Sequence, residues 1–249
     1  MPVLTEIAKN YLIKVPFIKR MAKKRHVTGF NQSEEGVQTI YDTYKRFTGF
    51  EGKNIIELGP GHTWGPAKKM KEAGAASVSI IDIERYIPDS VQEENPWLNY
   101  IIYPGGAMPL PADHFDLVLS YTVYEHLRQP ETTIRETYRI LKKGGMAIHL
   151  IDLGDHMYFK IDPAKQFNCL KYGSKTWDLM SRNRSIYVNR IRLSGWRQLH
   201  QQAGFSIAEE IPYIDEYSRE LYEKGQLQYL SPLKSEDRFA SNILLVVRK

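Results

Sequence analysis

The stretch NIIELGPG (54–61) decides the fold of this chain. Its first five residues form a short apolar run that ends at a glycine turn, which is typical of a buried strand. The next segment, WGPAKKMKEAG (64–74), has helical character and stops at Gly74, a residue suited to a helix C-terminus. A strand, a tight turn and a helix in this order predict the first βα unit of a parallel sheet.

The same alternation continues along the chain. Helices are expected at 130–145 and 194–204, and the last two strands follow each other without an obvious helix. Further strands are expected at 77–82, 100–103, 115–122, 146–152, 205–211 and 242–248. The predicted fold class is therefore α/β, with a doubly wound, Rossmann-like, seven-stranded and mostly parallel sheet that ends in an antiparallel C-terminal hairpin.

Composition supports a globular chain and excludes several classes of protein. The 249 residues are 42% hydrophobic and 25% charged, which excludes wholesale disorder. The single cysteine, Cys169, excludes an intrachain disulfide and a cysteine-cluster metal site. Neither a membrane-spanning apolar run nor a signal-peptide pattern is found, so a cytoplasmic location is expected.

The N-terminal 50 residues combine a basic run with an amphipathic segment. A solvated helix face is the ordinary interpretation of the run, and peripheral contact with a membrane surface is the alternative. Residues 32–47 have apolar side chains at helical spacing, with Ser33 placed to begin the helix. We expect residues 1–50 to form a helical cap over the binding pocket. The basic run consists of Lys19, Arg20, Lys23, Lys24 and Arg25.

The glycine turn limits the ligand that this sheet can bind. Trp64 stands where a dinucleotide-binding turn has its third glycine, which argues against NAD or FAD, and no P-loop lysine follows. The turn keeps Glu57 two residues before Gly59-Pro60-Gly61, and Asp82 ends the second strand. One carboxylate suits an ammonium group and the other suits the hydroxyls of a ribose. S-adenosylmethionine carries both groups and no phosphate, so it is the expected cofactor.

Four segments together resemble the class I S-adenosylmethionine-dependent methyltransferases, of the methyltransferase type 11 group. The resemblance covers about residues 54–152, and a later segment, GWRQLHQQAGFSI (195–207), is similar to a common late element of this group. The domain expected from it is 51–249. The four segments are IIELGPG (55–61), SIIDIE (79–84), FDLVLSYTVYEHL (115–127) and ETYRILKKGGMAIHL (136–150).

The resemblance implies a role for each matching position. Glu57 would face the methionine amino group, Asp82 would hold the ribose and Ile83 would pack on the adenine. Thr63 takes the place of a third glycine, and Gly106 stands where the family often has an aspartate for the adenine amino group. The turn would be lined by Gly59 and Gly61, the adenine bordered by Ala107 and Met108, and the sulfonium approached by Ser120 and Tyr121.

Polar residues that follow strands four and five are candidates for the methyl-acceptor site. A hydroxyl acceptor needs a base or a metal ion to remove its proton. HLIDLGDH (149–156) ends in Asp152, Asp155 and His156, and His126 follows strand four. We expect His156 to be the base, oriented by Asp152 or Asp155, with His126 as its rival. A base assisted by a divalent cation and a merely polar loop are the alternatives. His149, inside the strand, and Asp116 are expected to be structural.

Residues 157–193 form an insertion on the substrate side of the domain. Aromatic faces separated by Asn and Arg suit a sugar or a ring-bearing acceptor, and a packed lid is the alternative. Three runs, HLIDLGDH (149–156), SKTWDL (174–179) and YVNRIRLS (187–194), are loosely similar to methyltransferases associated with bacterial surface polysaccharides. The aromatic residues are Tyr158, Phe159, Phe167, Tyr172, Trp177 and Tyr187.

The expected activity is O-methylation of a sugar, a glycan or a small-molecule hydroxyl. An RNA methyltransferase is the second interpretation, encouraged by the basic N-terminal run. The chain has no base-methylating N-P-P-Y motif, however, and no pair of catalytic cysteines, which argues against a nucleic-acid partner. A third interpretation is a catalytically idle binding module on the same fold, against which the intact Glu57 and Asp82 argue.

Overall fold

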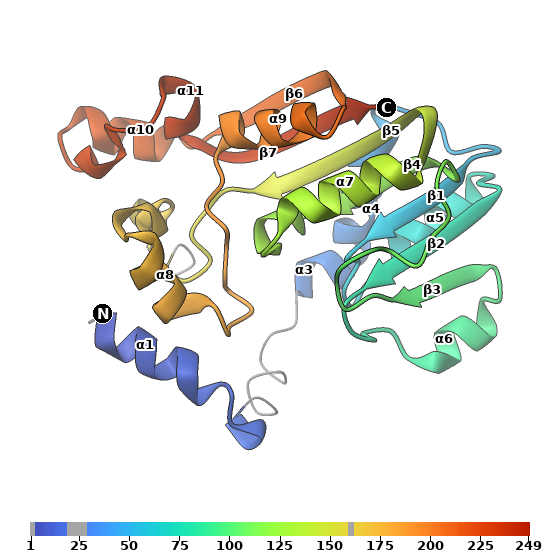
Figure 1. Cartoon of the computed structure of the whole chain (residues 1–249), viewed down its shortest axis with the longest axis horizontal. Helices are drawn as coiled ribbons and strands as arrows, with labels where there is room; N and C mark the ends of the chain where they lie inside the picture. The colour runs from blue at the N-terminus through green and yellow to red at the C-terminus, as the bar shows by residue number, and fades with distance from the viewer. Residues whose placement is uncertain (1–2, 19–28, 159–161) are drawn as a thin grey trace.

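The computed structural model describes residues 3–18, 29–158 and 162–249. Its strands form one seven-stranded sheet in the order β3-β2-β1-β4-β5-β7-β6 (Figure 1). The first five strands are parallel, and β7 runs antiparallel to both β5 and β6. The predicted fold class is confirmed. The strands are β1 (Asn54–Leu58), β2 (Ser77–Asp82), β3 (Leu98–Ile102), β4 (Phe115–Tyr121), β5 (Leu141–Asp152), β6 (Ser206–Ile214) and β7 (Ala240–Arg248).

Helices cover both faces of the sheet, and a further group of helices lies beyond the ends of the strands (Figure 1). Among the described residues, no helix has the length and apolar character needed to cross a membrane. The helices are α1 (Val3–Leu12), α3 (Gly29–Gln32), α4 (Glu34–Lys45), α5 (Gly65–Glu72), α6 (Asp89–Glu94), α7 (Pro130–Ile140), α8 (Ser174–Ser181), α9 (Leu193–Gln202), α10 (Glu216–Glu223) and α11 (Ser235–Arg238). Short 3₁₀ turns are η1 (Tyr124–His126), η2 (Pro163–Lys165), η3 (Asn168–Lys171) and η4 (Gln228–Leu230).

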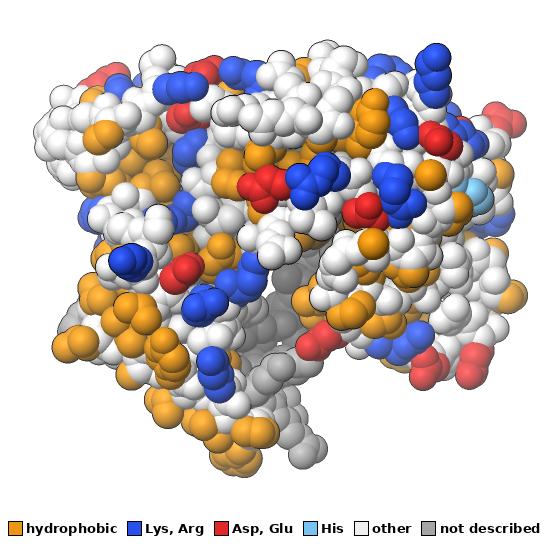
Figure 2. Space-filling model, in the orientation of Figure 1, with side chains coloured by type: hydrophobic (Ala, Val, Ile, Leu, Met, Phe, Trp, Pro, Cys, Tyr) orange, Lys and Arg blue, Asp and Glu red, His pale blue; other side chains and the backbone are white. Residues whose placement is uncertain are grey.

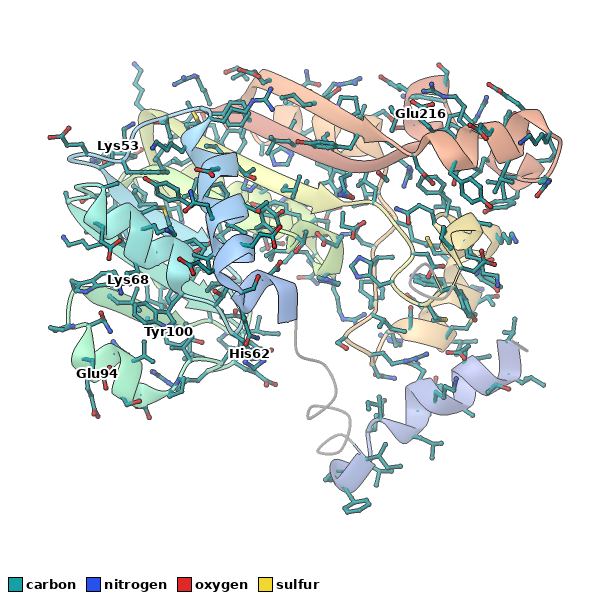
Figure 3. All side chains as sticks on the ribbon, turned by 180° about the vertical axis from the view of Figure 1, so that it is seen from behind. Lys53, His62, Lys68, Glu94, Tyr100 and Glu216 are labelled. Carbon is teal, nitrogen blue, oxygen red and sulfur yellow. The ribbon has the colours of Figure 1, made fainter. Side chains whose placement is uncertain are left out.

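The two faces of the sheet carry separate apolar cores because successive strand side chains point to opposite faces. On β1, Ile55 packs in the core that α4 and α5 cover, whereas Ile56 packs in the core that α7 and α9 cover. Figure 1 shows α7 in front of the sheet, and Figure 3, from behind, shows α4 crossing the other face. Both faces of the central strands are therefore buried, and their free carboxyl ends remain for binding.

The helix predicted near residues 32–47 is confirmed as α4, and it packs directly on the sheet. Ser33 precedes it, and the Ser33 hydroxyl accepts a hydrogen bond from the Gly36 amide at 3.0 Å. A Cβ on Gly65, at the start of α5, would lie 2.6 Å from a Val37 methyl, so glycine permits the close approach of α4 and α5. Whether residues 1–50 cap the pocket stays a prediction, and the five basic residues of the predicted run lie outside the described residues.

The predicted helix at 130–145 is wrong beyond its eleventh residue. Helix α7 ends at Ile140, and Leu141 already begins β5, where it is fully buried and pairs with Phe115. The pairing with β4 is irregular after this point, because Leu117 pairs next with Met146. Glycine at 145 permits the close approach there, since a Cβ would lie 2.8 Å from the Lys142 carbonyl oxygen. Lys142 and Lys143, which the prediction placed in the helix, lie in β5 instead.

The expectation that no helix joins the last two strands is also wrong. Helices α10 and α11 and the turn η4 lie between β6 and β7. Leu221, Leu227 and Leu230 of this connection pack with Phe167 in a small core of their own. The apolar residues of α10 and α11 are few and widely spaced, so hydrophobic periodicity alone did not indicate these helices.

Arg192 ties the ends of three segments together beside the carboxyl edge of the sheet. Its side chain is buried and donates hydrogen bonds to the carbonyl oxygens of Leu153, Asp237 and Ala240. Burial lowers the pKa of Arg192 to about 10, so the guanidinium remains charged at neutral pH. Since Leu153 follows Asp152 directly, this contact also fixes the loop after β5.

We predict that Arg192→Met lowers the free energy of unfolding by about 3–5 kcal/mol, because it leaves buried carbonyl groups without a donor. Arg219→Met is the matched control, since the Arg219 side chain is 42% exposed, forms a surface ion pair with Glu216 on α10 and lies over the Phe239 ring. Its cost is expected to stay below about 1 kcal/mol. Urea unfolding of both variants measures the difference, and equal losses would contradict the role given to Arg192.

Candidate functional site

The candidate site lies at the switch in strand order between β1 and β4. In open α/β sheets, ligands bind beyond the carboxyl ends of the strands at this point. Figure 3 shows Lys53 and His62 near opposite ends of β1, with His62 at the carboxyl end. Gly59 has a φ of +64°, and a Cβ there would lie 2.8 Å from both Val123 methyl groups. The loops after β1 and β4 are therefore in direct contact.

Thr122 is a site feature that the sequence did not reveal. It follows β4 and has a φ of +53°, which is unfavourable for a β-branched residue. Its amide donates a hydrogen bond to the Leu150 carbonyl oxygen at 2.8 Å, which holds the strained turn against β5. Strain of this kind is concentrated at functional sites, and here it sets the path of the backbone next to Gly59.

Glu57 is a buried carboxyl group with one unsatisfied oxygen. The side chain is 3% exposed, and Oε1 accepts a hydrogen bond from the Tyr44 hydroxyl at 3.1 Å. Among the described residues, Oε2 has no hydrogen-bond partner. Burial raises the pKa of Glu57 to about 7. A cationic ligand that met Oε2 would satisfy this oxygen and compensate the buried charge.

Asp82 closes the glycine turn from the end of β2. Its two carboxylate oxygens accept hydrogen bonds from the amides of Gly61 at 2.9 Å and Ile83 at 2.7 Å. Burial raises the pKa of Asp82 above its ordinary value, although the two amides oppose this shift. Ile83 is 61% exposed and therefore offers an apolar surface to a ligand. Thr63 is buried behind the turn.

The segment that includes Ala107 and Met108 is held by α7. The Met108 amide donates to Glu136 Oε2 at 2.7 Å, and its carbonyl accepts from Arg139 at 3.0 Å. The Met108 side chain is buried, whereas Ala107 and Gly106 are exposed. Only backbone and small side chains face outward at this border of the site.

The end of β4 combines a buried hydroxyl with a half-buried aromatic side chain. The Ser120 hydroxyl pairs with His149 Nδ1 at 2.8 Å and is fully buried, so its side chain points into the core. His149 is a core residue, as predicted, and stacks near Tyr124 with ring centroids 4.2 Å apart. Tyr121 lies on the face that α4 covers. Asp116 lies at the other end of β4 and is structural, accepting from the Asn54 amide and Lys142.

His156 and Asp152 form a hydrogen-bonded pair beyond the end of β5. Nε2 of His156 lies 3.0 Å from Oδ2 of Asp152, and both side chains are partly exposed. Burial opposes ionisation of Asp152, but the contact with His156, the hydrogen bond from the Gly154 amide and the nearby His126 together lower the pKa of Asp152. Asp155 does not join the pair, because its Oδ1 accepts from the amides of Met157 and Tyr158.

His126 lies next to this pair but is held by the insertion. Its ring centroid is 5.0 Å from that of His156, and Nδ1 lies 2.7 Å from the Tyr187 carbonyl oxygen. This contact requires a protonated Nδ1, so Nε2 is the acceptor in the neutral ring. Burial and the neighbouring His156 lower the pKa of His126 to about 4. His126 is therefore uncharged at neutral pH.

Glu125 is a second residue that the sequence did not indicate. It is 1% exposed, and both of its carboxyl oxygens lack a hydrogen-bond partner among the described residues. Burial and the nearby Asp152 raise the pKa of Glu125 well above its ordinary value. Glu125, Asp152 and His156 each offer an atom within 4.8 Å of the others, a spacing that also suits a divalent cation.

Most aromatic side chains of the insertion are packed rather than presented to a ligand. Trp177 and Phe167 are buried in two small cores, and the Trp177 ring nitrogen donates to the Val188 carbonyl oxygen. Tyr187 is partly exposed and stacks under Arg128 at 4.2 Å from its ring centroid. Phe159 lies outside the described residues. Among the described aromatic residues of this insertion, Tyr187 has the most direct link to the site, through its carbonyl contact with His126.

Comparison with known protein families identifies the central part of the chain. Residues 56–149 match the family model described as a methyltransferase domain. This segment includes most of β1, the glycine turn, Asp82, β4 and most of β5. An uncharacterised methyltransferase from Mycobacteroides abscessus is 27% identical over 122 residues, which are 47% of each chain.

One further relative is similar in sequence, and one solved structure is similar in fold. The chloroplastic 2-methyl-6-phytyl-1,4-hydroquinone methyltransferase of Arabidopsis thaliana is 30% identical over 95 residues, 37% of this chain and 28% of the relative. An S-adenosylmethionine-dependent methyltransferase structure from Mesorhizobium loti superposes with a TM-score of 0.60 at 18% identity, covering 86% of this chain and all of the other. The chain thus spans half or less of the curated relatives' length and shares its fold with the solved structure.

We predict that Glu57→Gln removes a pH-dependent loss of stability from the ligand-free protein. The folded-state pKa of about 7 lies above the value of 4.5 for an unburied glutamate, so ionisation destabilises the fold as the pH rises between them. This pKa difference corresponds to about 3 kcal/mol in the free energy of unfolding. The variant should therefore gain stability relative to wild type between about pH 4 and about pH 8.

Unfolding curves across this pH range provide the measurement. Glu94→Gln is the control, because Glu94 is an exposed residue of α6 (Figure 3), and its difference from wild type should stay flat. If the difference in unfolding free energy between Glu57→Gln and wild type also stays flat, the pKa of Glu57 is not raised by burial.

Proposed function

We propose that this chain, whose residues 56–149 form a methyltransferase domain on the class I fold, methylates a hydroxyl group of a sugar, a glycan or another small molecule. S-adenosylmethionine is the cofactor of this domain and supplies the methyl group on a sulfonium, which is a good leaving group. The observation that carries the proposal is the His156–Asp152 pair at the carboxyl end of β5, next to the cofactor crevice.

The chain's own residues fit the cofactor. The unsatisfied Oε2 of Glu57 suits the ammonium of the methionine part, and its burial makes a cationic partner valuable. Asp82 would accept the ribose hydroxyls beside the amides that already hold it, and the exposed Ile83 would pack against the adenine. Backbone groups near Ala107 would border the adenine, because Gly106 brings no side chain for its amino group.

A hydroxyl acceptor needs a proton acceptor beside it, and this is the role proposed for His156. The contact with Asp152 keeps the proton on Nε2, which leaves Nδ1 of the neutral ring free to accept a proton. The carboxylate would then stabilise the imidazolium that forms. His126 is the rival base, because its Nε2 is the unprotonated nitrogen of a neutral ring.

Metal-assisted deprotonation is a second candidate mechanism, and Glu125 is the observation that favours it. Two unsatisfied carboxyl oxygens beside Asp152 are costly to bury. A divalent cation would compensate them, and protonation of Glu125 would do so without any ion. A chelator separates the two mechanisms, since it abolishes activity only where an ion is required.

The acceptor class is proposed from the polar groups of the site, and it accords with the loose resemblance that the sequence suggested to methyltransferases associated with surface polysaccharides. Polar and ionisable groups at the mouth of the sheet suit a hydroxyl-bearing ring. The Arabidopsis relative is named for a hydroquinone, so hydroquinones belong in the same test. A methyl-transfer screen with labelled cofactor should compare nucleotide sugars, glycans, phenols, hydroquinones and RNA. Label on RNA alone would favour the RNA interpretation, and binding without transfer would favour an idle module.

We predict that Asp82→Ala weakens the binding of S-adenosylhomocysteine by about 1–3 kcal/mol, the range for leaving buried polar partners unpaired. Calorimetry measures the affinity, and an affinity unchanged by Asp82→Ala would move the ribose contact to Glu84. NAD should not bind, because Trp64 packs near Trp97, with ring centroids 6.4 Å apart, at the position of the third glycine. Tight NAD binding without S-adenosylhomocysteine binding would overturn the cofactor assignment.

We predict that His156→Ala lowers turnover by about 10²–10⁴-fold, the usual contribution of a general base. Cofactor affinity should stay close to that of wild type, because His156 lies on the acceptor side of the crevice. Asp152→Asn should have a smaller effect, since it removes the orienting charge and keeps the base. If His126→Ala is the inactive variant and His156→Ala turns over normally, the acceptor lies against β4 and the assignment fails.

A further inference from the structure

Helix α1 is docked with its polar side inward. The two residues of α1 that are buried are Glu6 and Asn10, which are 1% and 0% exposed. Leu4 and Leu12 on the same helix are 78% and 51% exposed. A surface helix of a globular protein normally has the opposite arrangement, with its apolar stripe against the core. The apolar side of α1 therefore faces outward, where another molecule or surface could cover it.

Directional contacts with α8 and the turn after it fix this orientation. The Glu6 carboxylate pairs with Arg184 at 2.6 Å and with Lys9 at 2.8 Å. The Asn10 side chain donates to the Leu179 carbonyl oxygen and accepts from the Asn183 amide, both at 2.8 Å. Rotating α1 to bury its leucines would break the contacts with Arg184, Leu179 and Asn183, so the exposed face is specified by the fold.

The outward residues form one apolar surface, here called the α1 face. Tyr11 of the same helix is 46% exposed, and Val15 and Phe17, beyond the end of the helix, are 45% and 70% exposed. Leu179 of α8 is 42% exposed. Figure 2 shows hydrophobic side chains gathered at this end of the molecule, and Figure 3 shows α1 standing away from the sheet. Gathered apolar side chains of this kind mark interaction sites. The α1 face consists of Leu4, Tyr11, Leu12, Val15, Phe17 and Leu179.

The charge around the α1 face is positive. Residues 3–18 and 174–190 carry six Lys and Arg but two acidic residues, and one of these, Glu6, is buried in its ion pairs. The sequence places five more basic residues in 19–25, outside the described residues. An apolar surface with surrounding lysine and arginine is complementary to a bilayer with anionic headgroups. A second copy of the chain would instead bring like charges together.

We propose that the α1 face binds peripherally to the surface of an anionic lipid bilayer. Leu12 and Phe17 would enter the boundary between headgroups and acyl chains, and Lys14 would meet lipid phosphates. Residues 183–190 connect the α1 face with the acceptor site. Asn183 and Arg184 hold α1, and the Tyr187 carbonyl oxygen contacts His126. The acceptor site would then stand close to the membrane. The proposal does not depend on the methyl acceptor.

Sedimentation of the full-length protein with vesicles tests the proposal. Wild type should bind vesicles that contain phosphatidylglycerol, bind phosphatidylcholine vesicles more weakly, and lose binding as the salt concentration rises. Leu12→Glu and Phe17→Glu should each weaken binding by at least about ten-fold, since each replaces a buried apolar contact with a charge. Their melting temperatures should match that of wild type, because both side chains are exposed.

Tyr217→Glu is the matched control. Tyr217 lies on α10 and is 49% exposed, close to the value for Leu12, so its variant should bind vesicles as wild type does. Equal losses in all three variants, or no vesicle binding by wild type, would overturn the proposal. A wild-type dimer that Leu12→Glu converts to a monomer, without vesicle binding, would show that a second copy covers the face. The readout is lipid association, so a failed methyl-transfer screen leaves this test intact.

Discussion

The burial of Glu57 at the carboxyl end of β1 is the constraint on which the site depends. A carboxyl group there is costly, because within the described part of the chain one oxygen accepts from the Tyr44 hydroxyl and the other has no hydrogen-bond partner. Helix α4 contributes that partner, and the close contact of α4 with Gly65 keeps the helix in place. The fold thus stores an unfavourable interaction at the switch point, and a cationic ligand would relieve it. Helix α4 is accordingly part of the same core as the sheet.

The acceptor side also has buried ionisable groups, but there some groups are held in the neutral form and another in the charged form. Glu125 and His126 are pushed toward their neutral forms, whereas Asp152 keeps its charge through His156. Groups held in different protonation states within a few ångströms are what acid–base chemistry requires. The insertion that supports His126 also docks α1, so the outward apolar face and the acceptor side share one structural support.

Much of the sheet could be predicted from sequence, because buried parallel strands are local apolar runs that end at turns. The Ser33 cap and the pairing of His156 with Asp152 were also accessible, since they involve residues three or four apart. The contacts of Glu57 with Tyr44, and of Glu6 and Asn10 with the region of α8, join distant segments that no periodicity connects. The early end of α7 depends on Leu141 pairing with Phe115, which overrides the helical pattern of 141–145. Glu125 resembled an ordinary loop residue until its burial was known.

The proton released on cofactor binding tests the central claim about Glu57 most directly. Near neutral pH the buried carboxyl is partly protonated, with a pKa of about 7, and an ammonium beside Oε2 would favour its charged form. Calorimetry with S-adenosylhomocysteine, in buffers of different protonation enthalpy, reports the protons exchanged. The account predicts proton release that is larger near pH 6 than near pH 8 and absent in Glu57→Gln. Equal release by wild type and Glu57→Gln, or none by either at any pH, would contradict it.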